Sequence, residues 1–425
     1  AAAPAGAASL AEPGKASVDF AHHAPRMARL NHASFGACPQ PVLRYQQTQR
    51  EAWLAEPDTW YFGGQLDEAL RRAARAAAPA LSGRPLDGDQ VCLVENATVA
   101  TAAIARRWAK LAEPGDVVVA LSMIYGASKH VLEEFCGTAG ARIEYLAVPF
   151  PCASQAEVVA AIDQQLADLR AAGARIRFAF LDHITSQPAV LLPARELVAV
   201  CRGRCGAEVE VAVDASHSVG SCVFDVADIG ADWFFSNLHK WGFAPSTATV
   251  VHASSPELMR GTRHPIPSWS WGRGLAAESR FSGTRDYSAM LAVPAAMEYL
   301  QRWRSERGET SQAFCHRRVQ EAARDLADAW GTAGALAPPE LVATQAMVKL
   351  PRDLRVDDVP GQPGGGVRDA LRARYCVEAA IGNFGPETGA WVRLSFGVYN
   401  TDKDVARLRD AVLELAELQQ AGHRI

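Results

Sequence analysis

The residues best suited to chemistry in this chain of 425 residues lie in three short motifs, each at the end of an apolar stretch. Two of these motifs carry charged groups. Asp214 closes the apolar run 208–214 and His217 follows it, whereas Lys240 lies within the aromatic stretch WFFSNLHKWGF. Burial disfavours the charged form of a lysine, so its pKa falls and its free amine becomes available for Schiff-base formation. A buried carboxylate in turn needs a cationic partner, and a protonated pyridine ring would provide one.

The third motif, ENAT at residues 95–98, joins an apolar strand to the start of a helix. We expect Thr98 at or near the N-cap, where free backbone N–H groups and a hydroxyl suit a phosphate. Each motif alone has an ordinary structural explanation: a capped helix, a turn aspartate and a surface lysine. Their order along the chain, with a phosphate turn, then a strand-end aspartate, then His-Lys, is the order of a pyridoxal-phosphate site.

The composition disfavours several other classes of protein. The 43 basic and 47 acidic residues are well mixed and the formal net charge is −4, which argues against binding to nucleic acid. No stretch approaches the ~18 apolar residues of a transmembrane helix, so we expect no membrane span. The nine cysteines show no repeated spacing that would indicate a disulfide framework. The one close pair, Cys201 and Cys205, lacks further ligands at metal-binding spacing, so we expect no metal site.

Helical and strand patterns alternate from about residue 40, which is typical of βαβ units. Continuous apolar runs rich in β-branched residues indicate parallel strands covered on both faces. The patterns predict strands at 91–95, 117–123, 143–148, 177–183, 208–214, 233–235 and 248–252, and helices at 65–80, 98–112, 126–136, 155–172, 193–203, 293–304 and 310–329. Ligands of open α/β sheets bind at the rim where the strands end, and the three motifs lie at such ends.

The chain is too long for one ordinary core, and its length fits two domains. We predict a large, mainly parallel α/β domain over residues 26–294, whose N-terminal segment reaches the mouth of the site, and a small α+β domain over 295–425. Residues 1–25, rich in Ala, Pro and Gly, have the composition of a disordered leader. We expect an intracellular protein, in a chloroplast or mitochondrion if this leader is the remnant of a transit peptide and in the cytoplasm otherwise.

The motifs as a set carry a family resemblance. ENAT, VDASH (213–217) and SNLHKW (236–241) resemble fold type I pyridoxal-phosphate enzymes of the class V aminotransferase group, which includes cysteine desulfurases and isopenicillin N epimerase. The chain is most similar to the plant and algal L-cysteine desulfhydrases, often called isopenicillin-N-epimerase-like, over about residues 20–415. Further motifs that carry this resemblance are LNHASFGACP (30–39), PDTWYF (57–62), LDHITSQPAVLLPARELV (181–198), FSGTRDYS (281–288) and WVRLSFGVYNT (391–401). It implies a large sheet of the seven-stranded type beside a small α+β domain.

The resemblance implies roles for the matching residues. Lys240 would hold pyridoxal 5'-phosphate through a Schiff base, and Asp214 would keep its pyridine nitrogen protonated. His217 would bond the phenolic oxygen of the cofactor, with Ser186 as a second contact, and Tyr125 would stack on the ring. The groups implied to hold the phosphate are Asn96, Ala97, Thr98, Asn237 and His239 of one chain and Thr284 of its neighbour. A homodimer with shared active sites is therefore implied.

The resemblance also implies an amino-acid substrate. Arg393 matches the arginine that grips the α-carboxylate with two parallel hydrogen bonds. Asn31 and His32 are expected to return to the mouth of the site. Lys240, freed by the substrate, would remove the Cα proton as general base. β-Elimination from L-cysteine would then yield hydrogen sulfide, pyruvate and ammonia.

Three related reactions stay open at this point. A cysteine desulfurase needs a nucleophilic cysteine on a C-terminal loop, yet Cys376 is the one cysteine in that part of the chain and the loop 381–389 has none. An epimerase needs a second acid/base, which His32, Tyr61 or another group could supply. The same elimination could act on a larger cysteine conjugate or sulfoxide.

Overall fold

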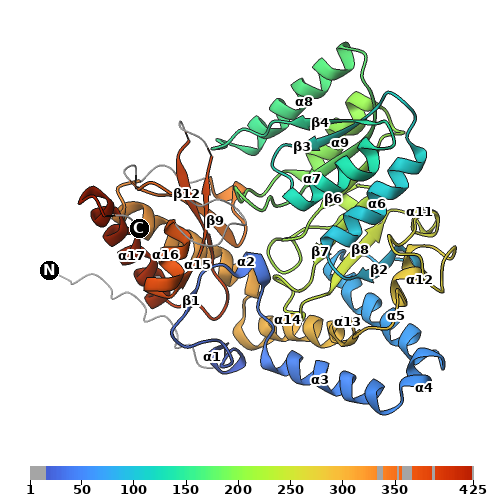
Figure 1. Ribbon diagram of the computed structural model, residues 1–425, viewed down its shortest axis with the longest axis horizontal. Helices are drawn as coiled ribbons and strands as arrows, with labels where there is room; N and C mark the ends of the chain where they lie inside the picture. Colours follow the sequence, from blue (N-terminus) through green and yellow to red (C-terminus); the bar gives the residue numbers. More distant parts are fainter. Residues whose placement is uncertain (1–15, 333–337, 352–353, 357–365, 385–387, 424–425) are drawn as a thin grey trace.

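The computed structural model of the protein describes residues 16–332, 338–351, 354–356, 366–384 and 388–423. Two lobes stand side by side in Figure 1, each around its own apolar core. We call the lobe built on the seven-stranded sheet the large lobe, and the lobe built on the three-stranded sheet the small lobe. The α/β fold class expected from the sequence is confirmed.

The large lobe is organised by one sheet, in the strand order β2-β8-β7-β6-β5-β3-β4. Only β8 runs antiparallel to its neighbours, so the carboxyl ends of the other strands share one edge. The strands are β2 (Val91–Val94), β3 (Asp116–Leu121), β4 (Arg142–Leu146), β5 (Arg175–Asp182), β6 (Glu210–Asp214), β7 (Trp233–Asn237) and β8 (Thr249–Ala253). Each lies within about two residues of its predicted range.

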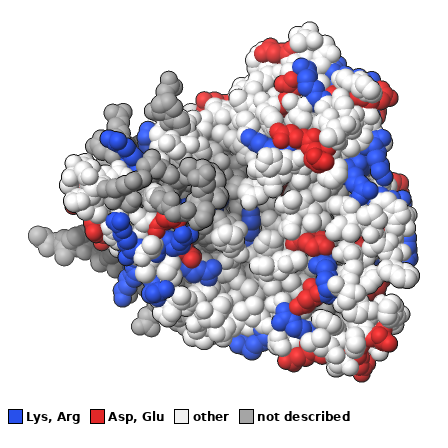
Figure 2. Space-filling view, viewed as in Figure 1, with Lys and Arg blue, Asp and Glu red and all other residues white. Residues whose placement is uncertain are grey.

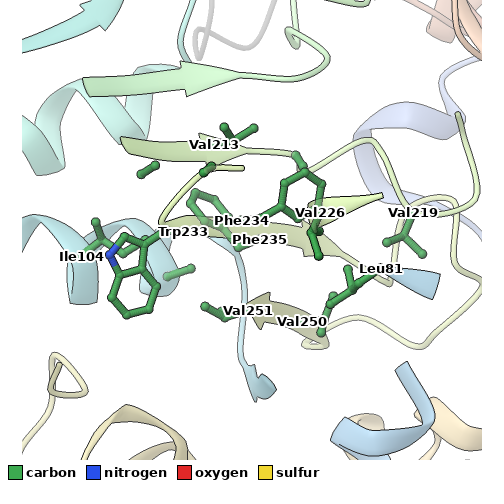
Figure 3. Close-up of a cluster of buried hydrophobic side chains, with 14 of the residues drawn as sticks. Leu81, Ile104, Val213, Val219, Val226, Trp233, Phe234, Phe235, Val250 and Val251 are labelled. Atoms are coloured by element: carbon green, nitrogen blue, oxygen red, sulfur yellow. The ribbon is translucent and has the colours of Figure 1, made fainter. Parts of the chain in front are cut away.

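Apolar side chains hold the central strands in place. Every residue of β3, β7 and β8 is buried, as expected of strands covered on both faces. Figure 3 shows Trp233, Phe234 and Phe235 of β7 close to Val213 of β6 and Val250 of β8. Because successive side chains of a strand point to opposite faces, β7 anchors the layers on both sides of the sheet. This packing fixes the strand ends from which the site is built.

Helices connect the strands and cover the sheet, as Figure 1 shows. Side chains cap several of them: Asn96 accepts from the third backbone N–H of α6, and Ser154 does the same for α8. The helices of the large lobe are α3 (Gln40–Ala55), α4 (Pro57–Tyr61), α5 (Gln65–Ala77), α6 (Ala97–Leu111), α7 (Gly126–Leu132), α8 (Gln155–Ala171), α9 (Ala194–Cys205), α10 (Val226–Ile229), α11 (Pro256–Gly261), α12 (Leu275–Arg280), α13 (Ser288–Leu291) and α14 (Val293–Arg307), with short helical turns at Ala78–Ala80, Gly88–Gln90 and Glu133–Gly137.

The small lobe combines a three-stranded antiparallel sheet, in the order β11-β12-β9, with the parallel pair β1 and β10. Its elements are β1 (Ala28–Arg29), β9 (Gln345–Lys349), β10 (Val377–Glu378), β11 (Ala380–Asn383), β12 (Ala390–Ser395), α15 (Ser311–Ala329), α16 (Val367–Tyr375), α17 (Asp402–Gln420) and the turn Pro339–Leu341. β1 comes from the N-terminal segment, which also forms α1 (Ala16–Asp19) and α2 (His32–Phe35). The chain therefore passes through the small lobe before it builds the large one.

The disordered leader predicted for residues 1–25 is wrong for residues 16–25. Phe20 is 3% exposed, and the centre of its ring lies 5.1 Å from that of Tyr399. Burying one aromatic side chain stabilises a segment by about 1.5–3 kcal/mol, which offsets the entropy cost of ordering about one or two of its residues. The Ala-rich composition concealed this single anchor. Residues 1–15 lie outside the described residues.

The domain boundary predicted after residue 294 also needs correction. It falls inside α14, whose buried residues Val293, Met297 and Trp303 belong to the large core. The small core takes over at Val319 in α15. The two cores separate after α14 because this helix packs on α3 and α5 of the large lobe.

Acidic and basic side chains are interspersed on the face shown in Figure 2, in line with the mixed composition. No helix in the described part of the chain is long and apolar enough to cross a membrane. All nine cysteines are free thiols. The described residues contain no group of three or more His, Cys, Asp or Glu side chains placed to hold a metal ion.

Candidate active site

Neighbouring strands of the large sheet bring two of the predicted site residues together. β5, β6 and β7 are adjacent and parallel. Asp214 is the last residue of β6, and Lys240 lies three residues beyond the end of β7. The small lobe supplies Arg393 from β12, and Figure 2 shows the surface hollowed between the two lobes. The site thus lies where the carboxyl edge of the sheet meets the small lobe.

Lys240 and His217 face each other in this region. Nζ of Lys240 lies 3.1 Å from Nε2 of His217. Burial lowers the pKa of Lys240 to about 7, although the charge of Asp214 opposes that shift. Burial also holds the pKa of His217 well below its usual range, and the lysine adds to that effect. At neutral pH the pair therefore offers a neutral imidazole and a reactive amine.

Asp214 is 3% exposed, and its Oδ1 accepts a hydrogen bond of 2.9 Å from the backbone N–H of Ser216. Burial raises the pKa of its carboxyl group. No ion pair joins it to another side chain of the described residues, so its charge is left without a direct partner. A protonated pyridine nitrogen is the kind of cation that such a carboxylate accepts, and Asp214 therefore fits the role implied for it.

The predicted phosphate turn follows β2. Its N-cap is Asn96 rather than Thr98, because Oδ1 of Asn96 accepts from the backbone N–H of Val99 at 3.0 Å. Asn96 and Thr98 are exposed. The N–H of Ala97 donates to Oδ1 of Asn237 over 3.1 Å, so Asn237 braces the turn through its carbonyl oxygen. The remaining groups at this helix start, above all those of Thr98, suit an anion.

His239 makes a backbone contact next to the lysine. Its Nδ1 lies 3.0 Å from the carbonyl oxygen of Ala248 and therefore carries the ring proton. Burial lowers the pKa of His239 to about 4. The ring is thus neutral at pH 7, so its remaining nitrogen, Nε2, is an acceptor that could hold a phosphate only through that group's own proton or a water.

Arg393 is held by four hydrogen bonds. It is 3% exposed, and its Nη1 donates to the carbonyl oxygen of Ser186 at 2.7 Å and to the Ser186 hydroxyl at 3.3 Å. Nη2 donates to Oδ1 of Asn31 at 2.8 Å and to the hydroxyl of Ser34 at 2.6 Å. All four acceptors are uncharged, so the guanidinium keeps its positive charge for a ligand. A buried cation held by neutral oxygens suits a carboxylate.

The N-terminal turn α2 connects this arginine with the lysine. Its residue His32 is 2% exposed and does not lie at the mouth of the site. Nε2 of His32 lies 2.9 Å from the carbonyl oxygen of Lys240, and Nδ1 lies 3.1 Å from the hydroxyl of Tyr399. Gly36 ends the turn at a φ of 68°, and a side-chain carbon there would lie 1.8 Å from the carbonyl oxygen of His239. Only glycine allows this close approach.

Tyr125 and Thr284 are both solvent-accessible. Tyr125 precedes α7 and is 56% exposed, as a ring left open to a ligand would be. Thr284 is exposed on a loop that Glu95 holds through Arg285 at 3.0 Å and Ser282 at 3.2 Å. Glu95 directly precedes the phosphate turn. The loop with Thr284 and that turn therefore form one connected region.

Three contacts were missed from the sequence. Ser34 accepts a hydrogen bond from Arg393. The ring of His32 contacts the hydroxyl of Tyr399, and its centre lies 4.3 Å from that of the Trp241 ring. Ser34 lies three residues after Asn31, and its hydroxyl donates to Oδ1 of Asn31 at 2.9 Å. That spacing, typical of one helical turn, was the available signal. Ser186 was expected near the cofactor, and it instead accepts hydrogen bonds from Arg393.

Comparison with known proteins agrees with this geometry. Residues 38–333 match the aminotransferase class-V family. Putative L-cysteine desulfhydrase 1 of Oryza sativa subsp. japonica is 38% identical over 423 residues, which cover 93% of this chain and 85% of the relative. L-cysteine desulfhydrase of Arabidopsis thaliana is 37% identical over 424 residues, which cover 94% and 90%.

A solved structure shares the fold at low sequence identity. It is the complex between the cystine C-S lyase C-DES and its reaction product cysteine persulfide, with a TM-score of 0.72 at 16% identity. The match covers 94% of this chain and 99% of that chain. The family match over most of the sequence, together with the two relatives, identifies the protein at the level of its family: the chain belongs to the class-V aminotransferases.

Proposed function

We propose that this protein is a pyridoxal-phosphate-dependent carbon–sulfur lyase that converts L-cysteine and water to hydrogen sulfide, pyruvate and ammonia. The observation that carries the proposal is a charged receptor for a carboxylate, Arg393, in the same cleft as an amine of lowered pKa, Lys240. An α-amino acid is the substrate that needs both. Similarity to proteins named L-cysteine desulfhydrase supports cysteine as that amino acid.

Each site residue has one task in the reaction. Arg393 binds the α-carboxylate and so fixes the orientation of Cα. The pyridoxal cofactor, when bound, withdraws electrons from Cα and makes its proton acidic. Lys240 removes that proton as a free amine, and the electron pair left behind expels the sulfur from Cβ. His217, 3.1 Å from Lys240, is placed to accept or return a proton at Nε2. Water then converts the three-carbon product to pyruvate and ammonia.

Transfer of sulfur to the protein, as a desulfurase would require, has little support. Burial raises the pKa of eight of the nine thiols, which disfavours the nucleophilic thiolate. The ninth, Cys376, directly follows α16 as its C-cap, and its carbonyl oxygen accepts a hydrogen bond of 2.9 Å from the N–H of Ala28. It is therefore fixed between α16 and β10, next to the β1–β10 pair, rather than on a loop that could move to the lysine.

Epimerisation has little support for a different reason. It needs a second acid/base, and the two candidates are already engaged. Both ring nitrogens of His32 have partners. The hydroxyl of Tyr61 donates to the carbonyl oxygen of Arg285 at 2.8 Å. Neither of these two groups is free to exchange a proton with Cα, and His217, the other acid/base of the site, contacts the lysine itself at 3.1 Å. Elimination is therefore the better-supported reaction.

We further propose a homodimer in which Thr284 of one chain completes the site of the other. Thr284 is exposed, and two exposed aromatic residues, Phe62 (83%) and Trp269 (91%), each follow a residue that hydrogen-bonds to the segment 281–285. Mixed dimers test this arrangement. Lys240→Ala and Thr284→Ala homodimers should each be impaired, whereas refolding the two together should restore one wild-type site. Failure of the mixture to regain activity would argue against shared sites.

The reaction itself is tested by a screen of products from L-cysteine, D-cysteine, cystine and cysteine S-conjugates. Sulfide and pyruvate from L-cysteine would support the proposal. If a thiol is released only from a cysteine S-conjugate, the substrate assigned to the enzyme would be that conjugate, and the reaction would still be elimination. A D-amino acid without sulfide would favour epimerisation. The compartment in which the protein works stays a prediction, which localisation of the protein in cells would test.

A further inference from the structure

One buried acid in the site has no role in the mechanism above. Asp182, the last residue of β5, is 3% exposed. Its Oδ2 is buried without a hydrogen-bond partner in the described part of the structure. A buried carboxylate in that condition costs several kcal/mol if it is ionised. The residue therefore needs an explanation that a surface aspartate would not.

The sheet places Asp182 directly beside Asp214. The two residues are register partners in the parallel strands β5 and β6. Neighbouring strands lie about 4.8 Å apart, and register partners point to the same face of the sheet. The backbone N–H of the next residue, His183, donates to the carbonyl oxygen of Asp214 at 2.9 Å, which holds the two strand ends together. Two carboxyl groups thus stand side by side at the edge where the cofactor binds.

No basic group of the described residues pairs directly with Asp182 or Asp214. The charged groups that act on the pKa of Asp182 are Asp214 on β6, Lys129 on α7 and Lys240 after β7. None of the ion pairs within 4.0 Å that the described residues form includes either carboxylate. Burial raises the pKa of Asp182 well above its usual range, and the charge of Asp214 adds to this effect. Lys240 has a lowered pKa and so contributes at most part of a charge at neutral pH.

Charge balance then decides how many protons the pair holds. A pyridine nitrogen brings one positive charge to Asp214, and one carboxylate balances it. A second buried negative charge next to the first would be repelled, which is why adjacent buried carboxyl groups keep one proton between them. Asp214 would be the ionised member, because it is the residue that would hold the ring nitrogen.

We propose that Asp182 is a positioning residue that stays protonated in the folded enzyme and holds the carboxylate of Asp214 in place for the pyridine nitrogen. The described structure contains no hydrogen bond between the two carboxyl groups, so the proposal requires the acid hydrogen of Asp182 to turn toward one oxygen of Asp214, which would leave the other for the cofactor. The inference depends on the cofactor alone. It holds equally for elimination, epimerisation or sulfur transfer.

Substitution of Asp182 by Asn and by Ala tests the inference on the apoprotein. Asn has the shape of the protonated acid, keeps a hydrogen-bond donor and has no charge. We expect Asp182→Asn to bind pyridoxal phosphate, followed by its absorption spectrum, within about threefold of wild type. Asp182→Ala should bind it about tenfold more weakly, the loss expected for one hydrogen bond to a charged group. Equal losses in both variants would show that a negative charge is needed and would overturn the proposal, as would wild-type affinity in both.

A matched control and an independent measurement complete the test. Asp116, also buried, forms an ion pair of 2.6 Å with Arg175 at the other end of the sheet. Asp116→Asn should lower thermal stability without changing cofactor affinity. If Asp182→Ala fails to fold, infrared spectroscopy still shows whether Asp182 is protonated. Wild type at about pH 7 should show the carbonyl stretch of a buried protonated carboxylic acid, and Asp182→Asn should lose it. A wild-type spectrum without that band would contradict the inference.

Discussion

The imidazole of His32 donates from Nε2 to the backbone carbonyl of Lys240 over 2.9 Å, although 208 positions separate the two residues in the chain. The hydroxyl of Tyr399 lies 3.1 Å from the other ring nitrogen, so both nitrogens are engaged. Burial lowers the pKa of His32 to about 3, and the ring is neutral at physiological pH. The N-terminal segment thereby fixes the backbone from which the reactive lysine projects.

Removal of this contact should impair chemistry more than substrate binding. We expect His32→Ala to lower kcat about 10- to 100-fold with a small change in KM, because a misplaced lysine reacts poorly even when the substrate is bound. Steady-state kinetics with L-cysteine would measure both values. His252→Ala is the control, since it empties a similarly buried position on β8, where the ring is 5% exposed. An equal loss of kcat in both variants would mean that His32 acts only through general stability.

The arginine prediction concerns recognition of the carboxylate. Arg393→Lys keeps a positive charge but loses the planar fork that the carbonyl oxygen of Ser186, Asn31 and Ser34 hold in place. We expect its KM for L-cysteine to rise about 100-fold, the cost of roughly 2.7 kcal/mol for a charge-assisted pair. Binding of cysteamine, which lacks the carboxylate, should change little. A similar loss for cysteamine would show that Arg393 does not read the carboxylate.

Much of this arrangement could be foreseen from the sequence because it depends on local patterns. Apolar runs ending in polar residues place Asp214 and Lys240 at strand ends, and a parallel sheet brings such ends together. The sequence could not reveal the contacts of α2. His32 and Tyr399 are far apart in the chain, and only the packing of the small lobe on the lysine loop makes them neighbours. The burial of Phe20 could not be predicted for the same reason, because the rings that it contacts belong to residues far away in the chain.

The titration of Lys240 should appear in the rate of cofactor uptake. Its pKa of about 7 lies below that of a free lysine, so the neutral, reactive amine forms as the pH rises through 7. We therefore expect the apoprotein to take up pyridoxal phosphate slowly at about pH 6 and faster by roughly tenfold at about pH 8. Stopped-flow absorbance would follow the reaction. If the uptake rate instead rises with a midpoint near pH 10, the amine has the pKa of a solvated lysine, which would contradict the burial seen in the structure.

Glu95 should support the phosphate region and the loop with Thr284. Its pKa is lowered to about 2, because His264 and Arg285 outweigh the effect of burial. Glu95→Gln would release Arg285 and Ser282, so we expect a loss of about 1–2 kcal/mol of stability and weaker cofactor binding. The depressed pKa means that this contribution is present above about pH 4.5 and is lost as the pH falls toward 2. Chemical denaturation of wild type and Glu95→Gln at about pH 7 and pH 4 would measure this pH dependence. The difference in free energy of unfolding between the two proteins should be smaller at pH 4, and a larger difference there would contradict the prediction.

The ratio of products from L-cysteine tests the central claim most directly. Elimination predicts sulfide and pyruvate in equal amounts, no alanine, and no change in Cys376→Ser, because no protein thiol takes up the sulfur. Sulfide should be measured together with pyruvate and alanine in one reaction without added thiol. Alanine in amounts equal to protein-bound persulfide, with both lost in Cys376→Ser, would contradict the account and identify a desulfurase instead.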